Sequence, residues 1–238
     1  MERKIPPETI DTLARSIFKE ASGYGFGQVD IIRLINVLMD LCTDSEFPAN
    51  SPGEETRPDL GALTGPPLEL PLVGERIKIR PFDNTQDKRL LERWLPDKYG
   101  RFFVLSCATA QSITIDALTD SRNNHLGIIT LLDGTPIGAM AFLDHSKKQK
   151  RAELRKLIGD TASRGKGLAE DATKLWIAYG ARTLNLEKIY VSTLQTQISN
   201  IKLNERIGFR VEGLLRDEVT IDGSRHDVLR MGLCISAA

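Results

Sequence analysis

The chain has 238 residues, 41% of them hydrophobic, which is enough for one full-sized domain with a buried core and a smaller part beside it. Its 32 basic and 32 acidic residues balance, which argues against a protein that gathers nucleic acid electrostatically. No stretch approaches about 18 consecutive apolar residues and the N-terminus has no apolar signal core, so we expect a cytoplasmic protein with no membrane partner. The three cysteines, Cys42, Cys107 and Cys234, are far apart in sequence, so we expect them to be reduced thiols.

Residues 1–47 predict a small helical hairpin. Apolar residues recur at helical spacing over residues 8–22, behind Pro6 and Pro7, and again over residues 28–41, with glycines between the two runs. Two helices of this length cannot bury their apolar stripes alone. We therefore expect the hairpin to dock on a partner or to form a homodimer.

One alternative for this region is an acyl-carrier module, in which Ser45 of the Asp44-Ser45 pair would carry a phosphopantetheine arm. That pattern requires a long helix directly after the serine. Here Glu46-Phe47-Pro48 opens a proline-rich stretch instead. The docking hairpin is therefore the preferred interpretation.

Residues 48–72 have the composition of a linker. They contain six of the 11 prolines, at positions 48, 52, 58, 66, 67 and 71. This composition favours extended chain over a packed element. Leu60, Leu63, Leu68 and Leu70 nevertheless offer apolar contacts, so the linker can lie along a surface.

Residues 73–238 predict a second domain of mixed α/β type. Strict alternation marks residues 76–80 as a half-buried strand, and Asp133-Gly134 between two apolar runs is a hairpin signal. The predicted elements are strands at 76–80, 127–132, 136–143, 151–158 and 188–194, helices at 88–95 and 170–184, and, after residue 197, a short helix followed by two closing strands. We expect a mostly antiparallel sheet flanked by helices.

The stretch from Arg151 to Glu170 carries the strongest functional signal. A strand ends at Gly159, and after a polar turn Arg164-Gly165-Lys166-Gly167-Leu168-Ala169 opens a helix. Glycine permits unusual φ, and the unpaired N–H groups of a helix's first turn bind anions such as phosphate. The spacing fits neither a Walker loop nor a dinucleotide fingerprint, and a tight turn without a ligand stays the alternative.

This stretch resembles the GNAT superfamily of acetyl-CoA-dependent N-acetyltransferases. The similarity comprises a strand with Ala152-Glu153-Leu154, the spacing Arg164-x-x-Gly167-x-Ala169, a short helix closed by Gly208-Phe209, and the run Glu212-Gly213-x-x-Arg216. The chain from Ile221 to Leu233 resembles the branch that holds ribosomal-protein N-terminal acetyltransferases and amino-sugar acetyltransferases. The resemblance extends more loosely back to about Val73 and implies a GNAT-like domain over residues 73–238.

The resemblance implies acetyl-CoA as co-substrate, no metal, and a set of site residues. Glu153 matches the carboxylate that takes the amine's proton; its alternative is a strand carboxylate paired with Arg151 or Arg155. The residues implied in cofactor binding are Leu157, Gly159, Arg164, Gly165, Lys166, Gly167, Leu168, Ala169, Asn200 and Asn204.

The chain departs from the family pattern at the group that protonates the CoA thiolate. Many relatives carry a tyrosine four residues before the helix-ending glycine, where this chain has Asn204, and some use a serine eight before it, where this chain has Asn200. An amide donates a hydrogen bond but gives up no proton near neutral pH. Ser199, Thr196, a water or the substrate is then left for this role, or no dedicated acid is needed.

The acceptor stays open at this stage. The branch implies either a protein N-terminus or a nucleotide-linked amino sugar, and the balanced charge favours the primary amine of a small molecule. The alternative from another class is a non-catalytic acyl-CoA-binding or scaffold module. His125, His145 and His226 lack partners at metal-ligand spacing and are predicted surface residues, and Cys107 is disfavoured as a nucleophile.

Overall fold

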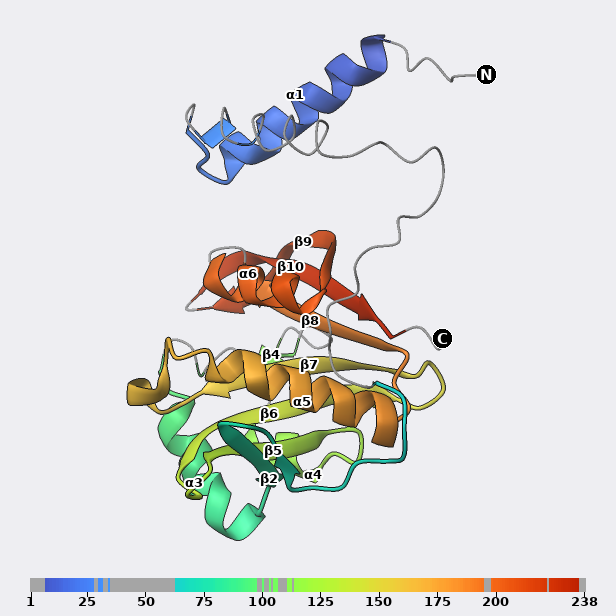
Figure 1. The fold of residues 1–238 in the computed structure, drawn as a ribbon. Coiled ribbons are helices and arrows are strands. Elements are labelled where there is room, and N and C mark those ends of the chain that lie inside the picture. The colour runs from blue at the N-terminus through green and yellow to red at the C-terminus, as the bar shows by residue number, and fades with distance from the viewer. Residues whose placement is uncertain are drawn as a thin grey trace. The chain divides into compact units, whose positions relative to one another are not determined.

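A computed structural model of the chain describes residues 7–27, 30–31, 34, 63–97, 100, 103, 105–106, 111–112, 114–194, 198–221 and 223–235. The chain divides into two compact units, Met1–Thr56 and Arg57–Ala238 (Figure 1). In the first unit, α1 spans Pro7–Gly23 and confirms the first predicted helix. Residues 30, 31 and 34 are helical, whereas the rest of the predicted second helix, and Asp44-Ser45, lie outside the described residues.

The second unit contains an eight-stranded sheet, a two-stranded sheet of β3 and β4, and the helices from α3 onward. Its strands are β1 (Leu72–Val73), β2 (Ile77–Pro81), β3 (Leu105–Ser106), β4 (Gln111–Ser112), β5 (His125–Leu131), β6 (Pro136–Ser146), β7 (Arg151–Ile158), β8 (Lys188–Leu194), β9 (Arg210–Ile221) and β10 (Ser224–Cys234). Its helices are α3 (Asn84–Trp94), α4 (Ile115–Asp120), the 3-10 helix η2 (Thr161–Ser163), α5 (Leu168–Thr183) and α6 (Ile198–Ile207).

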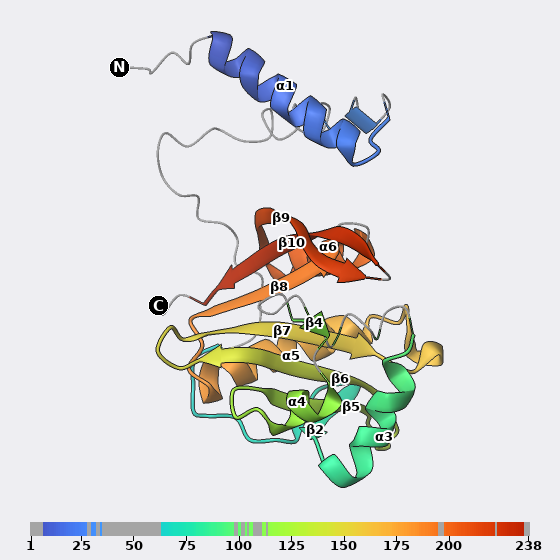
Figure 2. The same cartoon turned by 180° about the vertical axis from the view of Figure 1, so that it is seen from behind.

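Eight strands form one mixed sheet in the order β1-β2-β5-β6-β7-β8-β10-β9. Its pairs are antiparallel, except that β7 and β8 run parallel because α5 connects them as a crossover. Figures 1 and 2 show β7 and β8 diverging toward the end of β7 that leads into α5. The predicted fold class, a mostly antiparallel α/β sheet flanked by helices, is confirmed.

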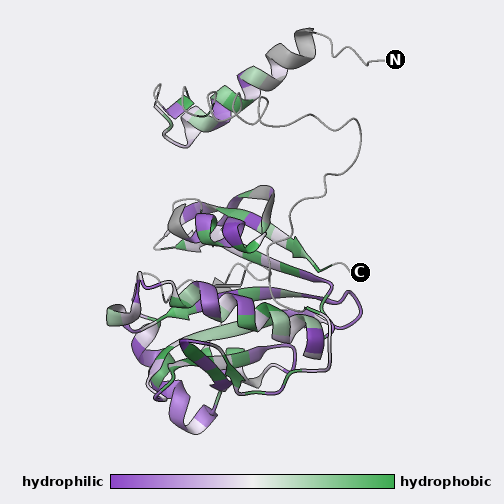
Figure 3. Ribbon diagram, viewed as in Figure 1, coloured by the Kyte–Doolittle hydropathy of each residue, from purple (hydrophilic) through white to green (hydrophobic). Residues whose placement is uncertain are grey.

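Each face of the sheet has its own apolar core. The first core joins one face to α5 and α6 and includes Phe142, Trp176 and Phe209; the second joins the other face to α3 and α4 and includes Trp94 and Leu157. Figure 3 shows hydrophobic colouring gathered on the strands and hydrophilic colouring along α3. Because side chains alternate along a strand, consecutive residues of β7 belong to different cores.

The helix predicted at residues 88–95 begins earlier, at Asn84. Asp83 caps it, since its carboxylate accepts hydrogen bonds from the N–H groups of Thr85 and Gln86. The first turn is anchored by Asp87, a buried carboxylate 2.6 Å from a guanidinium nitrogen of Arg80 on β2. This turn differs from the predicted start because its residues are polar, and polar residues give no apolar period.

The stretch before β1 packs on the domain, as its leucines suggested. Leu63, Leu68 and Leu70 contact the first core. The N–H of Leu68 donates to Thr183 Oγ1 at 2.9 Å, and that hydroxyl donates to the carbonyl of Leu68 at 2.7 Å. Within the described part of the chain, no helix is long and apolar enough to span a membrane.

Candidate active site

The loop after β7 is held by the guanidinium of Arg164. Its Nε donates to the carbonyl of Ile158 at 2.9 Å, and an NH2 group contacts Asp97 and the carbonyl of Gly159. A side chain at Gly159 would begin with a Cβ 2.2 Å from the Trp94 ring. Arg164 and Gly159, both predicted to contact the cofactor, thus also fix the end of β7.

The start of α5 has the geometry of an anion site. Gly165 and Gly167 have φ of +74° and +78°, and Gly167 caps α5 without any side-chain hydrogen bond to its first turn. The N–H groups of Leu168 and Ala169 come next, and the Lys166 side chain is exposed beside them. This arrangement places the helix dipole and first-turn donors where a diphosphate can reach them.

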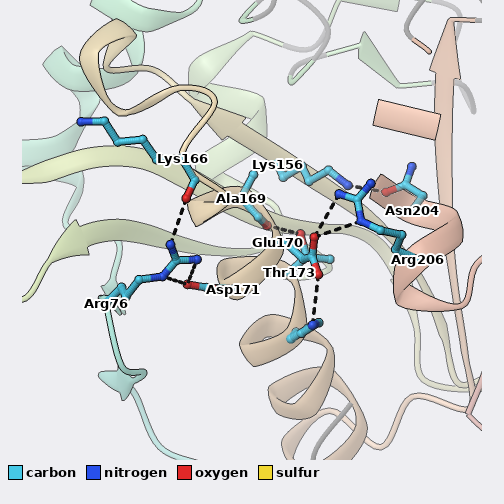
Figure 4. A network of polar contacts seen from close by, with 10 residues as sticks. Arg76, Lys156, Lys166, Ala169, Glu170, Asp171, Thr173, Asn204 and Arg206 are labelled. Atoms are coloured by element: carbon cyan, nitrogen blue, oxygen red, sulfur yellow. Dashed lines mark hydrogen bonds and ion pairs between the residues drawn. The ribbon is translucent and has the colours of Figure 1, made fainter. Parts of the chain in front are cut away.

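Arg76 is a further cation at this helix start and was not among the predicted site residues. Its NH1 group donates to the carbonyl of Lys166 at 2.9 Å, and its Nε donates to Asp171 at 2.7 Å (Figure 4). A Cβ on Gly167 would lie 3.2 Å from its NH2 group. Arg76 precedes β2 by one residue, about 90 positions away in sequence, so no local motif could have revealed it.

Pairing between β7 and β8 is short. It consists of Arg151 with Lys188, Ala152 with Ile189, and Glu153 with Tyr190. Beyond that point, β7 stays paired with β6 and β8 with β10. We call the facing, unpaired edges at residues 154–158 and 191–194 the fork. Unpaired strand edges carry backbone donors and acceptors that can hydrogen-bond an extended ligand.

Two asparagines of α6 lie on the same side of the sheet as α5. Asn204 is fully buried, and its Oδ1 accepts a hydrogen bond from Nζ of Lys156 on β7 (Figure 4). Asn200 Nδ2 donates to Thr193 Oγ1 on β8 at 3.1 Å. Predicted from the family pattern alone, both asparagines thus reach the strands of the fork. Thr196 and the Ser199 side chain lie outside the described residues.

Lys156 is the second functional candidate that the sequence analysis missed. Burial lowers its pKa to about 7. A signal was available, because Lys156 shares a face of β7 with Leu154 and Ile158, which pack on the first core. A lysine on the inward face of a strand requires a polar partner or a ligand.

Glu153 lies on the opposite face of β7, at the base of the fork. It is 1% exposed, and its Oε1 lies 2.9 Å from a guanidinium nitrogen of Arg155. The pairing with Arg155 weighed in the sequence analysis therefore exists. This pair is compatible with the predicted role of Glu153 as a base, because a carboxylate held by one guanidinium still has oxygen lone pairs that can accept a proton.

The prediction of surface histidines was wrong for His145, which is 5% exposed. Its Nδ1 lies 3.0 Å from His125 Nε2, across the end of the β5–β6 pair. Burial lowers the pKa of both rings, so both stay neutral and one ring nitrogen can accept from the other. Among the described residues, no group of three or more His, Cys, Asp or Glu could hold a metal ion.

Comparison with known proteins agrees with this geometry. A family model for the acetyltransferase (GNAT) domain matches residues 76–210. The spermidine N(1)-acetyltransferase of Escherichia coli (strain K12) is 34% identical over 162 residues, covering 68% of this chain and 82% of that protein. A putative ribosomal N-acetyltransferase of Bacillus subtilis (strain 168) is 25% identical over 170 residues, covering 68% of this chain and 92% of its own length.

The fold is shared with a solved structure, the spermidine N-acetyltransferase of Vibrio cholerae in complex with CoA and spermine. The TM-score is 0.57 at 20% identity, covering 68% of this chain and 96% of that one. A forked sheet in front of a glycine-rich helix start defines the class of protein, an acyltransferase that uses acetyl-CoA. The chain belongs to the GNAT acetyltransferase family.

Proposed function

We propose that this enzyme transfers the acetyl group of acetyl-CoA to the primary amine of a small molecule, with Glu153 as the group that accepts the amine's proton. The observation that carries the proposal is the end of β7–β8 pairing at Glu153 and Tyr190. A pantetheine arm that bonds the strand edges of the fork, with its diphosphate at the start of α5, would bring its thioester toward Glu153.

The chain's own residues divide the work between binding and proton transfer. Gly165, Gly167 and the first turn of α5 bind the diphosphate, with Arg76 and Lys166 adding positive charge. Acetyl-CoA supplies an activated thioester when bound. An amine arrives protonated at neutral pH, so Glu153 accepts one proton before the nitrogen forms its bond to the carbonyl carbon.

Two small-molecule acceptors have support. The similarity of the closing strands to amino-sugar acetyltransferases favours a nucleotide-linked amino sugar. The relatives named for spermidine favour a polyamine. Acetylation of a protein N-terminus is the alternative, supported by the relative named as a putative ribosomal N-acetyltransferase.

A release assay for free CoA thiol tests the proposal. The full chain and acetyl-CoA would be incubated with glucosamine, a nucleotide-linked amino sugar, spermidine and an N-terminal peptide, and the products would be identified by mass. N-Acetylglucosamine is the matched control, because its nitrogen is already acylated. We expect release with at least one small amine and none with the control. Release only with the peptide, or with no acceptor, would contradict the proposal.

A further inference from the structure

Five polar residues share one face of the sheet beside the fork. Residues that pair across neighbouring strands point to the same face, so the pairs Glu153 with Tyr190 and Ser192 with Arg230 place these side chains together. Arg155 joins them, two residues after Glu153 on β7. We call Glu153, Arg155, Tyr190, Ser192 and Arg230 the polar face.

Ser192 and Arg230 each carry a buried hydrogen-bond donor atom on the polar face for which the described part of the chain provides no acceptor. Ser192 Oγ and Arg230 Nε are buried and have no hydrogen-bond partner among the described residues. Their residues stand directly opposite each other on β8 and β10, where Cβ atoms are about 5 Å apart. A buried donor without an acceptor is costly, so two of them side by side indicate a site for a ligand's oxygen atoms.

The polar face itself carries two guanidinium groups, those of Arg155 and Arg230, and one carboxylate, that of Glu153. The Arg230 guanidinium lies 4.9 Å from the centre of the Tyr190 ring. Burial, followed by the charges of Glu153 and Asp144, raises the pKa of Tyr190 to about 12, so its hydroxyl stays a donor. Arg155 already offsets the charge of Glu153. A polycation such as spermidine would meet guanidinium groups here.

We infer that the polar face binds an anionic group of the acceptor, so that the acceptor is an amine that also bears a carboxylate or a phosphate. The inference rests on the proposed function and narrows it. The anion would bond Ser192 Oγ and Arg230 Nε, and the amine of the same molecule would lie toward Glu153. Charge-assisted bonds of this kind contribute on the order of 10- to 100-fold in affinity.

Matched acceptor pairs test this inference on the full chain at saturating acetyl-CoA. The phosphate pair is glucosamine 6-phosphate and glucosamine, and the carboxylate pair is β-alanine and β-alanine amide. We expect kcat/KM to be at least about tenfold higher for the anionic member of one pair, and the preferred pair identifies the anion. A preference for the neutral members, or for spermidine, would overturn the inference.

Variants of the polar face show which residues cause the preference for an anionic acceptor. Arg230→Gln should lower the ratio of anionic to neutral kcat/KM by on the order of 10- to 100-fold, and Ser192→Ala by a few-fold. Arg225→Gln is the matched control, because Arg225 is an exposed arginine on the same strand, bonded to the carbonyl of Asp217. It should leave the ratio unchanged. A ratio that survives Arg230→Gln would overturn the inference, and Arg230→Lys, which should lower it partly, serves if the Gln variant does not fold.

A binding readout separates this inference from the proposed function. If neither these pairs nor any small amine of the release assay is acetylated, the proposed function fails. Calorimetry of the same pairs on the CoA complex then decides the inference alone. Tighter binding of the anionic member supports it, and equal binding of both members overturns it.

A separate observation, the contact between Lys156 and Asn204, concerns the leaving thiolate. Lys156 Nζ reaches from β7 to α6 on the face opposite Glu153. The nearby charged groups are already paired, Glu170 with Lys174 and Arg206, and Arg76 with Asp171 (Figure 4). The described partner of the Lys156 ammonium is therefore a neutral amide, at the position where many relatives have a tyrosine.

We propose that Lys156 protonates the sulfur of CoA, a role that also rests on the proposed function. When the carbon–sulfur bond of the tetrahedral intermediate breaks, its electron pair stays on sulfur, and the proton moves from Lys156 Nζ to that sulfur. Neutral Lys156 then takes a proton from water. Together with the amine protons released through Glu153, the step yields the amide, CoA thiol and solvent protons.

Lys156→Met tests this role against a role in binding. The proposal expects kcat to fall by on the order of 100-fold while the Kd of acetyl-CoA changes less than about threefold. The descending limb of the kcat profile near pH 7 should also disappear, since only protonated Lys156 donates. Lys174→Met is the control, because Lys174 is a half-buried lysine on α5 that is paired with Glu170. A weaker Kd with unchanged kcat would overturn the proposal, and Lys156→Arg gives the same readout if the Met variant does not fold.

Discussion

The two faces of β7 at the fork solve the problem of a buried charge differently. On one face, Glu153 is held by the guanidinium of Arg155 on its own strand. On the other face, Lys156 has a neutral amide as its described partner, and burial lowers its pKa to about 7. Because alternate residues of a strand point to opposite faces, four consecutive positions provide a charged acceptor on one side and a titrating donor on the other.

The largest effect should follow from breaking the ion pair between Glu153 and Arg155. Arg155→Met leaves the Glu153 carboxylate buried without that guanidinium, and removing one partner of a buried pair costs about 3 kcal/mol. Urea unfolding would measure this loss. Arg182→Met on the far end of α5 is the control, since its Nε bonds only an exposed carbonyl, that of Pro66. Equal unfolding midpoints for both variants would mean that the pair contributes nothing to stability.

Removing the Asn204 amide, which contacts Lys156, should weaken the binding of acetyl-CoA. Asn204 is implied in cofactor binding by the family pattern, so for Asn204→Ala we expect the Kd of acetyl-CoA to weaken up to about tenfold, the effect of losing one hydrogen bond to the cofactor, with kcat lowered less than threefold. Calorimetry and stopped-flow turnover give the two numbers. A thousandfold drop in turnover at unchanged affinity would refute this prediction.

Lys156 should make the free energy of unfolding depend on pH. The pKa of Lys156 is lowered to about 7 from 10.5, so between these values the folded chain binds fewer protons than the unfolded chain. Stability from this group therefore rises as pH increases from about 7 to about 10.5, and the cost of the buried charge is fully present below pH 7. Lys156→Met should flatten that rise in thermal unfolding, and an unchanged slope would show that Lys156 titrates normally.

The smallest effect should follow from changing Gly167 at the start of α5. Gly167→Ala forces a side chain into φ +78° and places its Cβ 3.2 Å from Arg76, which costs about 1 kcal/mol. We expect a small drop in melting temperature and a few-fold weaker binding of acetyl-CoA. Gly134→Ala is the control, because its φ is also positive and nothing lies within 4 Å of its added Cβ. Equal acetyl-CoA affinity in both variants would place the diphosphate elsewhere.

Local patterns predicted most of the fold. The bounds of β7 and β8 were predicted correctly, because apolar alternation and the flanking glycines are local signals. The start of α3 was missed, since a polar cap and the buried Asp87–Arg80 pair set it. The His125–His145 contact was missed for a related reason, because it joins two strands at a β-bulge near Asp144.

The site could be predicted only where its residues are consecutive. Gly165, Gly167 and Glu153 lie in one motif, whereas Arg76, just before β2, and Arg230, on β10, lie far from that motif in sequence. The partner of Lys156, and so its burial, depends on how α6 packs against β7. No spacing within one segment encodes such contacts, because they depend on strand order.

The most direct test of the central claim is a single-turnover measurement of acetyl transfer by Glu153→Gln at saturating acetyl-CoA. If Glu153 accepts the amine's proton at the base of the fork, transfer should slow by at least about 100-fold while the Kd of acetyl-CoA stays within twofold of the parent chain. Transfer at the parent rate would contradict the account.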